Sequence, residues 1–161
     1  MSNETLIRPA EARDLPAVVA LVAALAEFEK LPGPDADALA RMTSDFARGR
    51  FSLLVAESDH VVNAYALYFF TYSTFRALPS LYLEDLFVHP TARGHKIGER
   101  LMRRLADEAV RNGCGRFEWT VLDWNVRAQK FYLSLGAELL AEWRTCRVDG
   151  DALTRLAARA T

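Results

Sequence analysis

A glycine-containing loop, Arg93-Gly94-His95-Lys96-Ile97-Gly98, lies between an apolar run and a segment with helical periodicity. Backbone N–H groups at the start of a helix have no partner inside the helix and carry the positive end of its dipole, so the loop could bind a phosphate or pyrophosphate. Its glycines would let the backbone approach such a ligand closely. Six residues with two glycines also occur by chance, and an ordinary structural turn explains the motif equally well.

Two other positions could take part in proton transfer. Glu84 lies in the apolar run 81–88, where a carboxylate is costly unless it faces water or a partner. Tyr132 carries a phenol that is protonated at neutral pH and can donate a proton. Each also has a structural explanation: Glu84 and Asp85 as an exposed or ion-paired patch, and Tyr132 as a core residue whose hydroxyl is bonded.

Hydrophobic periodicity predicts the elements that would position these residues. Strands are predicted at 5–8, 51–57, 61–72, 81–88 and 117–121, with a final hairpin over 138–148. Helices are predicted over 15–28 with Asp14 as the cap, over about 37–47, over 97–111, and from a cap at Asn125 to about 135, with a short helical tail. The strand-helix-strand unit at 81–122 implies a parallel strand pair inside a mixed sheet. We therefore expect an α/β fold in a single domain, 1–161, with its ligand site at the middle of the sheet.

Besides the loop, several blocks stand in a fixed order along the chain: Phe69-Phe70-Thr71-Tyr72, the run LYLEDLFV at 81–88, Trp124-Asn125, Phe131-Tyr132 and Leu135-Gly136-Ala137. The diamine acetyltransferases of the GNAT superfamily carry such blocks in the same order. Over about residues 5–148 the chain thus resembles this family, which includes the spermidine/spermine and thialysine acetylating enzymes. The resemblance implies a GNAT-like mixed, mostly antiparallel sheet with helices on both faces and a central parallel strand pair.

The resemblance also implies an activity, transfer of an acetyl group from acetyl-CoA to a primary amine of a small cationic substrate such as a polyamine, diamine or lysine analogue. Two alternatives stay open: an acceptor amine on a protein or an aminoglycoside, or a catalytically silent CoA-binding regulatory domain. In the family's pattern Glu84 accepts the proton of the amine, directly or through water, and Tyr132 protonates the leaving thiolate.

The family's ligand-binding positions carry over to two sets of residues. Those implied to bind the cofactor are Leu86, Phe87, Val88, Arg93, Gly94, His95, Lys96, Ile97, Gly98, Glu99, Asn125, Arg127, Ala128 and Tyr132. Those implied to bind the amine are Phe28, Glu29, Glu84, Glu118, Trp119, Thr120 and Glu142. Asn125 could equally serve only as a helix cap, and Arg127 only as a solvated charge.

Lys96 departs from the family's pattern, because it stands where the loop usually has its middle glycine. If the position requires positive φ, lysine is costly there; if it is right-handed, its N–H still donates to the ligand. We expect CoA binding to be retained.

The composition limits the kinds of partner that the protein is expected to bind. The net charge of −1 and the pI near 6.3 give no long-range attraction to nucleic acid or an anionic membrane.

The first residues lack the basic and apolar regions of a signal peptide, which leads us to expect a cytoplasmic protein. Cys114 and Cys146 lack metal-ligand spacing, and we expect two buried thiols and no metal. Apolar residues of the predicted final hairpin favour a homodimer; they are Leu139, Leu140 and Trp143.

Overall fold

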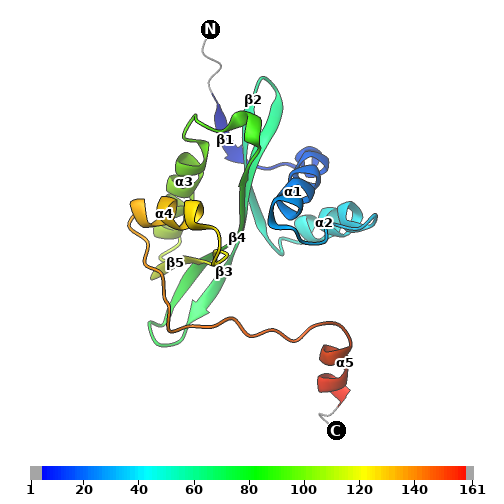
Figure 1. Ribbon diagram of the computed structural model, residues 1–161, viewed down its shortest axis with the longest axis vertical. Helices are drawn as coiled ribbons and strands as arrows, with labels where there is room; N and C mark the ends of the chain where they lie inside the picture. The colour runs from blue at the N-terminus through cyan, green and yellow to red at the C-terminus, as the bar shows by residue number, and fades with distance from the viewer. Residues whose placement is uncertain (1–4, 159–161) are drawn as a thin grey trace. The chain divides into compact units, whose positions relative to one another are not determined.

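The computed structural model describes residues 5–158, which divide into two compact units with the boundary between Thr120 and Val121 (Figure 1). The first unit contains a five-stranded sheet in the order β1-β2-β3-β4-β5. Its strands are β1 (Leu6–Pro9), β2 (Ser52–Ser58), β3 (Val61–Ser73), β4 (Leu78–Val88) and β5 (Arg116–Trp119). All neighbouring pairs are antiparallel except β4 and β5, which are parallel, so the predicted mixed sheet is confirmed.

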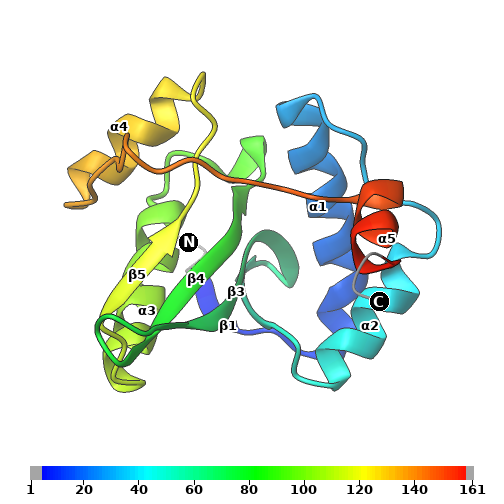
Figure 2. The same ribbon diagram turned by 90° about the horizontal axis from the view of Figure 1, so that it is seen from below.

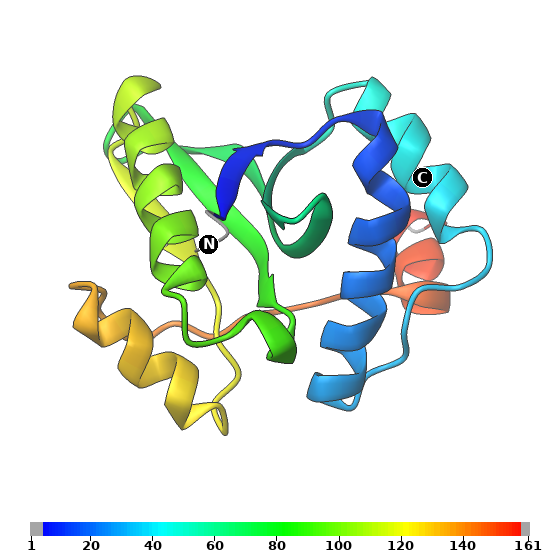
Figure 3. The ribbon, with the colours of Figure 1, turned by 90° about the horizontal axis from the view of Figure 1, so that it is seen from above.

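Helices cover both faces of this sheet, as predicted. Helices α1 (Leu15–Glu29) and α2 (Ala38–Ala47) lie on one face, and α3 (Ile97–Arg111) lies on the other (Figures 2 and 3). Two single-turn 3₁₀ helices, η1 (Ala12–Asp14) and η2 (Pro90–Ala92), precede α1 and α3. Among the described residues, no helix is both long and apolar enough to span a bilayer.

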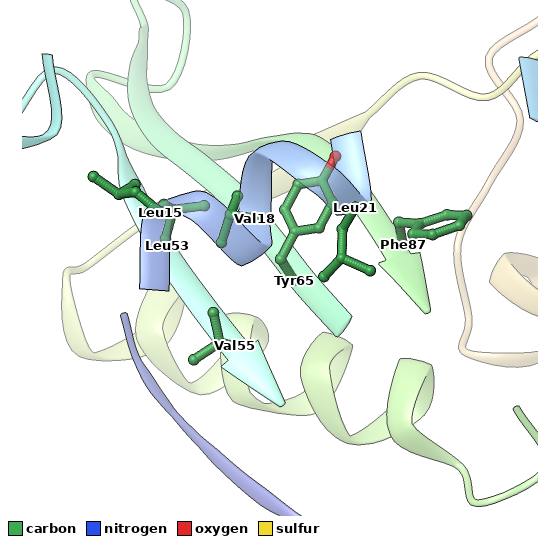
Figure 4. Packing of buried hydrophobic residues seen from close by; sticks show 7 residues of the cluster. All are labelled: Leu15, Val18, Leu21, Leu53, Val55, Tyr65 and Phe87. Atoms are coloured by element: carbon green, nitrogen blue, oxygen red, sulfur yellow. The ribbon is translucent and has the colours of Figure 1, made fainter. Parts of the chain in front are cut away.

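The core between α1 and the sheet is built from apolar side chains at helical spacing on one side and alternating strand positions on the other. Figure 4 shows this cluster, whose members are Leu15, Val18, Leu21, Leu53, Val55, Tyr65 and Phe87. On the opposite face α3 buries residues spaced by four, namely Ile97, Leu101, Leu105 and Ala109, together with Met102. The buried positions of α3 thus recur at the helical spacing from which this helix was predicted.

The start of α1 corrects one prediction. Asp14 makes no side-chain capping bond to α1. Its carboxylate accepts instead from Arg8, with Nη1–Oδ2 at 2.7 Å and Nη2–Oδ1 at 2.9 Å, and from the Glu11 backbone N–H at 2.8 Å. Arg8 also contacts Glu57 Oε2, at 2.6 Å through Nη2. A fork-shaped guanidinium bound to two carboxylates competes successfully for a side chain that would otherwise cap the helix, and it ties β1 to β2 and η1.

The second unit contains α4 (Val126–Ser134) and α5 (Gly150–Ala158). Asn125 caps α4 as predicted, since its side-chain oxygen accepts from the Ala128 N–H at 3.1 Å. The predicted final hairpin is wrong: residues 138–148 are exposed and form no strand. Apolar residues alone do not make a strand, because an isolated hairpin without a sheet or helix to pack on is at most marginally stable. Cys146 in this segment is exposed, not buried, and Cys114 is partly buried.

Arg8→Met should lower the free energy of unfolding by about 2–3 kcal/mol, because Asp14 and Glu57 would stay partly buried without their cation. Arg41→Met is the matched control, since Arg41 pairs with Asp35 at 2.8 Å on the surface, and it should lower the free energy of unfolding far less. Denaturant unfolding at pH 7 measures both. Equal small losses would mean that the Arg8 network stabilises no more than a surface pair.

Candidate active site

Strand β4 contains an extra residue at Glu84. Its partners on β3 run from Asp85 opposite Leu67 directly to Leu83 opposite Tyr68, so Glu84 has no partner in the ladder. This is a β-bulge, and bulges occur preferentially beside functional sites because they redirect side chains. Glu84 is exposed there, which removes the cost that an apolar run would impose on its carboxylate.

The bulge decides which face of the sheet receives Asp85. Leu83 pairs with Tyr68, whose pKa is raised by burial and by the charge of Glu108 on α3, whereas Asp85 pairs with Leu67, which packs in the α1 cluster. Without the extra residue, Leu83 and Asp85 would share a face, because strand side chains alternate with a period of two. The bulge thus transfers Asp85 from the α3 side to the α1 side.

On the α1 side Asp85 is partly buried and accepts a hydrogen bond from the Tyr65 hydroxyl at 3.1 Å to Oδ2. Burial, together with the negative charges of Glu84 and Glu29, raises the pKa of Asp85 to about 6, while the bond from Tyr65 opposes that rise. Burial also raises the pKa of Glu29, the last residue of α1. The structure therefore gathers three carboxylates where the end of α1 meets the bulge of β4.

Two of these three acids, Glu29 and Glu84, were predicted from the sequence as site residues, whereas Asp85 was missed. A signal for Asp85 was available, since a second carboxylate in an apolar strand needs a partner as much as the first. The partner, Tyr65, lies twenty positions away on β3. Only the register between the two strands brings the pair together.

Beyond the bulge, β4 has an unpaired edge. Pairing with β5 runs from Ser80 opposite Arg116 to Leu83 opposite Trp119 and ends there. Residues 86–88 continue to pair with β3 on their other side. Apart from the Val88 carbonyl, which accepts from Arg93, no strand among the described residues pairs with their backbone on the β5 side, where an extended ligand could hydrogen-bond to the strand, a common mode of recognition. This is where Leu86, Phe87 and Val88 were expected to bind the cofactor.

Arg93 connects the loop to this strand. Its Nε donates to the Val88 carbonyl at 3.1 Å. The guanidinium carbon lies 6.0 Å from the ring centroid of Phe28 and 5.9 Å from that of Phe87, within range of cation–π attraction. The structure therefore brings together Phe28, expected at the amine site, with Phe87 and Arg93, expected at the cofactor site.

The loop between η2 and α3 exposes Gly94, His95 and Lys96 at the surface. Lys96 is the N-cap of α3 in the left-handed conformation, with φ 56° and ψ 20°, and its side chain makes no capping bond. The first N–H groups of α3 are left to other partners. Of the two conformations considered for Lys96, the structure has the left-handed one, which favours glycine. In the first turn, Glu99 is paired with Arg103 at 2.7 Å.

The candidates on and after β5 have partners of their own. Glu118 forms an ion pair with Arg116, Nε–Oε2 2.9 Å, so a substrate ammonium would compete with that guanidinium. The ring of Trp119 lies 4.8 Å from that of Phe117. Thr120 follows the strand and is exposed.

The remaining candidates lie in the second unit. The Ala128 N–H is bound to Asn125, which accounts for the capping role of that asparagine. Tyr132 is partly buried, with its ring centroid 5.3 Å from that of Phe131. Arg127 and Glu142 are exposed. The contacts given for these residues lie within the second unit.

Comparison with known proteins identifies the class to which this fold and this site belong. Residues 19–137 match the family described as Acetyltransferase (GNAT) family. The chain therefore belongs to the GNAT acetyltransferase family and is an acetyltransferase of that type. The fold class and the family resemblance inferred from the sequence are both confirmed.

Among curated proteins, the chain is 36% identical to a thialysine N-epsilon-acetyltransferase of Mus musculus, over 96% of this chain and 98% of that protein. It is also 44% identical to an L-ornithine N5-acetyltransferase of Arabidopsis thaliana, over 60% of this chain and 42% of that protein. The chain thus spans almost the whole length of the first relative and less than half of the second.

Solved structures share the fold. An integron cassette protein from V. cholerae superimposes with a TM-score of 0.76 at 26% identity, covering 95% of this chain and 97% of that one. An aminoglycoside N-acetyltransferase solved in complex with CoA gives a TM-score of 0.77 at 20% identity, covering 92% of this chain and 97% of that one.

Asp85→Asn should change stability in a pH-dependent way. A carboxyl whose pKa rises on folding costs nothing well below pH 4, where both states are protonated, and the cost accumulates as pH rises from about 4, where the unfolded state ionises, to about 6, where the folded state does. Relative to wild type, the variant should therefore gain up to about 3 kcal/mol of unfolding free energy between pH 4 and pH 7. Glu27→Gln, at an exposed position of α1, is the control. Unfolding titrations that show the same pH dependence for both variants would contradict the burial of Asp85.

Lys96→Gly should raise the unfolding free energy by about 0.5–1 kcal/mol, because glycine removes the cost of a left-handed lysine. CoA affinity, measured by calorimetry, should stay equal or improve. Lys30→Gly is a control with the same left-handed geometry at the end of α1. A large loss of affinity confined to Lys96→Gly would mean that the ammonium itself binds the phosphates.

Proposed function

We propose that the chain transfers an acetyl group from acetyl-CoA to a primary amine of a small cationic substrate, such as a diamine, polyamine or lysine analogue. The observation that carries this proposal is the carboxylate-bearing bulge of β4 directly before its unpaired edge. The edge can hold an extended donor and the carboxylates can hold an amine, so both reactants would meet on one strand. The names of the thialysine and ornithine acetyltransferases support a small amine as acceptor.

The residues fit a CoA group. The backbone of Leu86, Phe87 and Val88 would hold the pantetheine arm, and the N–H groups that begin α3 would hold the pyrophosphate. Acetyl-CoA, when bound, supplies the acetyl group as a thioester. Further contacts from the two units are part of the same proposal: Gly94, His95, Lys96, Ile97, Gly98, Glu99, Arg127 and Tyr132.

The acceptor must lose a proton before it attacks the thioester. An alkyl amine with a pKa near 10.4 costs about 4–5 kcal/mol to deprotonate at pH 7. Glu84, exposed in the bulge, is the proposed acceptor of that proton, directly or through water. Tyr132 is proposed to donate a proton to the thiolate that leaves.

The amine site would be formed by side chains from α1, β4 and the end of β5. Glu29 is partly buried and lies within electrostatic range of Asp85, and the exposed ring of Phe28 could cover an alkyl chain. Glu118, Trp119, Thr120 and Glu142 complete the proposed set, with Glu118 shared with Arg116.

We also propose that the protein is a cytoplasmic homodimer. The segment that forms no strand exposes Leu139, Leu140 and Trp143, at 48%, 51% and 74% of their surfaces, and a dimer interface would cover them. A monomeric mass in light scattering would contradict the dimer.

The function is tested by measuring thiol release from acetyl-CoA against polyamines, lysine analogues, amino acids, aminoglycosides and a peptide with a free N-terminus. Transfer to a small cationic amine, with the highest kcat/KM of the set, is the expected result. Preference for the peptide or the aminoglycoside would replace the proposed acceptor. CoA binding without transfer to any amine would favour the silent binding domain.

Glu84→Gln should reduce kcat/KM strongly at pH 7, and the loss should shrink as pH rises toward the pKa of the amine, where the neutral amine is abundant. Glutamine keeps the size of the side chain but cannot accept the proton. A loss that is constant across pH and confined to KM would assign Glu84 to substrate binding alone.

Tyr132→Phe should leave acetyl-CoA affinity unchanged and lower kcat by roughly 10²-fold or more, as expected when a general acid is removed. Phe131→Leu, at the neighbouring ring, is the control for packing. Unchanged single-turnover rates in Tyr132→Phe would reassign the tyrosine to packing.

A further inference from the structure

Tyr65 is a fully buried tyrosine at the centre of β3. Its ring packs in the cluster between α1 and the sheet, beside Leu21 and Phe87, as Figure 4 shows. Phenylalanine would fill the same space, so packing does not explain the hydroxyl. A buried hydroxyl without a partner is costly, and this one has a partner in Asp85, to which it donates at 3.1 Å.

The hydroxyl acts as a permanent donor. Burial and the charge of Asp85 raise the pKa of Tyr65 far above its ordinary value, so the phenol keeps its proton at every physiological pH. Asp85 therefore always receives this hydrogen bond through Oδ2, which fixes the orientation of its carboxylate.

The surroundings of Asp85 otherwise oppose its negative charge. Glu84 on its own strand and Glu29 on α1 both raise its pKa, and burial does so more strongly. Tyr65, on β3, acts in the opposite direction because its bond favours the ionised form. Among the described residues, the groups that shift the Asp85 pKa are thus two carboxylates that repel its charge and one hydroxyl that stabilises it.

We propose that Tyr65 is a positioning residue for the acceptor amine: its hydroxyl orients the Asp85 carboxylate and keeps it anionic, so that Asp85 can hold the positive charge of the substrate. This inference rests on the proposed function, because it assumes a cationic acceptor beside the β4 bulge. Tyr65 is itself fully buried and its hydroxyl is bonded to Asp85, so it acts through the aspartate. Removing the hydroxyl should therefore change how the site responds to pH, which a purely structural role would not do.

The test is Tyr65→Phe, with Tyr68→Phe as the matched control. Tyr68 is also buried on β3, but besides burial its pKa is raised by Glu108 and lowered by Arg104, both of α3, and its hydroxyl is bonded to Ser52. Titration of the Asp85 side-chain carboxyl by NMR, on the full chain without substrate, should show its pKa rising by about 0.5–1 unit in Tyr65→Phe and unchanged in Tyr68→Phe. An unmoved Asp85 titration in Tyr65→Phe would overturn the inference, whatever the activity.

The kinetic consequence should follow the titration. In Tyr65→Phe, KM for the amine should rise about three- to tenfold near pH 6, with kcat and acetyl-CoA affinity nearly unchanged, and the low-pH limb of kcat/KM should move to higher pH. In an Asp85→Asn background, adding Tyr65→Phe should leave the pH profile unchanged, because the group through which the hydroxyl acts is absent. If Tyr65→Phe only weakened folding, its effect would be the same in both backgrounds, so the comparison distinguishes a folding defect from the proposed role.

The outcomes separate the inference from the proposed function. A shifted Asp85 titration with an unchanged KM and pH profile would overturn the role of Tyr65 toward the amine while acetyl transfer stands. Failure of the folded wild type to acetylate any amine would overturn the proposed function, and the role toward the amine with it. An equal effect of Tyr65→Phe in the wild-type and Asp85→Asn backgrounds would show that Tyr65 acts on packing.

Discussion

The extra residue in β4 determines the geometry of the site. A strand of strict alternation would direct Leu83 and Asp85 to the same face, where α3 packs on the sheet. The bulge at Glu84 instead sends Asp85 to the α1 face, next to Tyr65 and within electrostatic range of Glu29. Pairing with β5 ends one residue before the bulge, at Leu83, so the unpaired edge of β4 begins where the acids are. One insertion in one strand thus brings Asp85 to the face of the other acids, directly before the open backbone of β4.

The carboxylates of the site lower the stability of the fold, and the packing and the hydrogen bond around them offset that loss. Burial, with the charges of Glu84 and Glu29, raises the pKa of Asp85, and burial raises the pKa of Glu29, so ionising these two carboxyls opposes folding at neutral pH. The bond from Tyr65 and the well-packed core of α1 against β2, β3 and β4 act in the opposite direction. The Arg8 network is the contrasting case: its two carboxylates bind a guanidinium, the pKa of Asp14 is lowered, and the arrangement stabilises the fold. At the site the pKa values of Asp85 and Glu29 are raised, whereas Asp14 and Glu57 bind a guanidinium and join β1 to β2 and η1.

The cofactor and amine positions are physically connected in the first unit. Arg93 begins the loop before α3, yet its guanidinium lies against Phe28 at the end of α1 and Phe87 on β4, and its Nε binds the Val88 carbonyl. A ligand that moves this loop would therefore disturb contacts with the end of α1. Lys96 in this loop is left-handed, so at this position the backbone adopts the geometry that glycine favours although the residue is lysine.

Local patterns in the sequence were sufficient for the helices, the five strand segments up to β5, the cap at Asn125 and the family, since these depend on periodicity, capping chemistry and ordered motifs. They were insufficient wherever a residue's state depends on a distant partner. Asp14 stands at the N-cap of α1, but its side chain binds Arg8 and makes no capping bond, and residues 138–148 form no strand, because each outcome depends on which partner is available in space. Asp85 is the clearest case. Its type and neighbours are visible in the sequence, but its face and its bond to Tyr65 follow from a register shift between two strands, which only the tertiary structure defines.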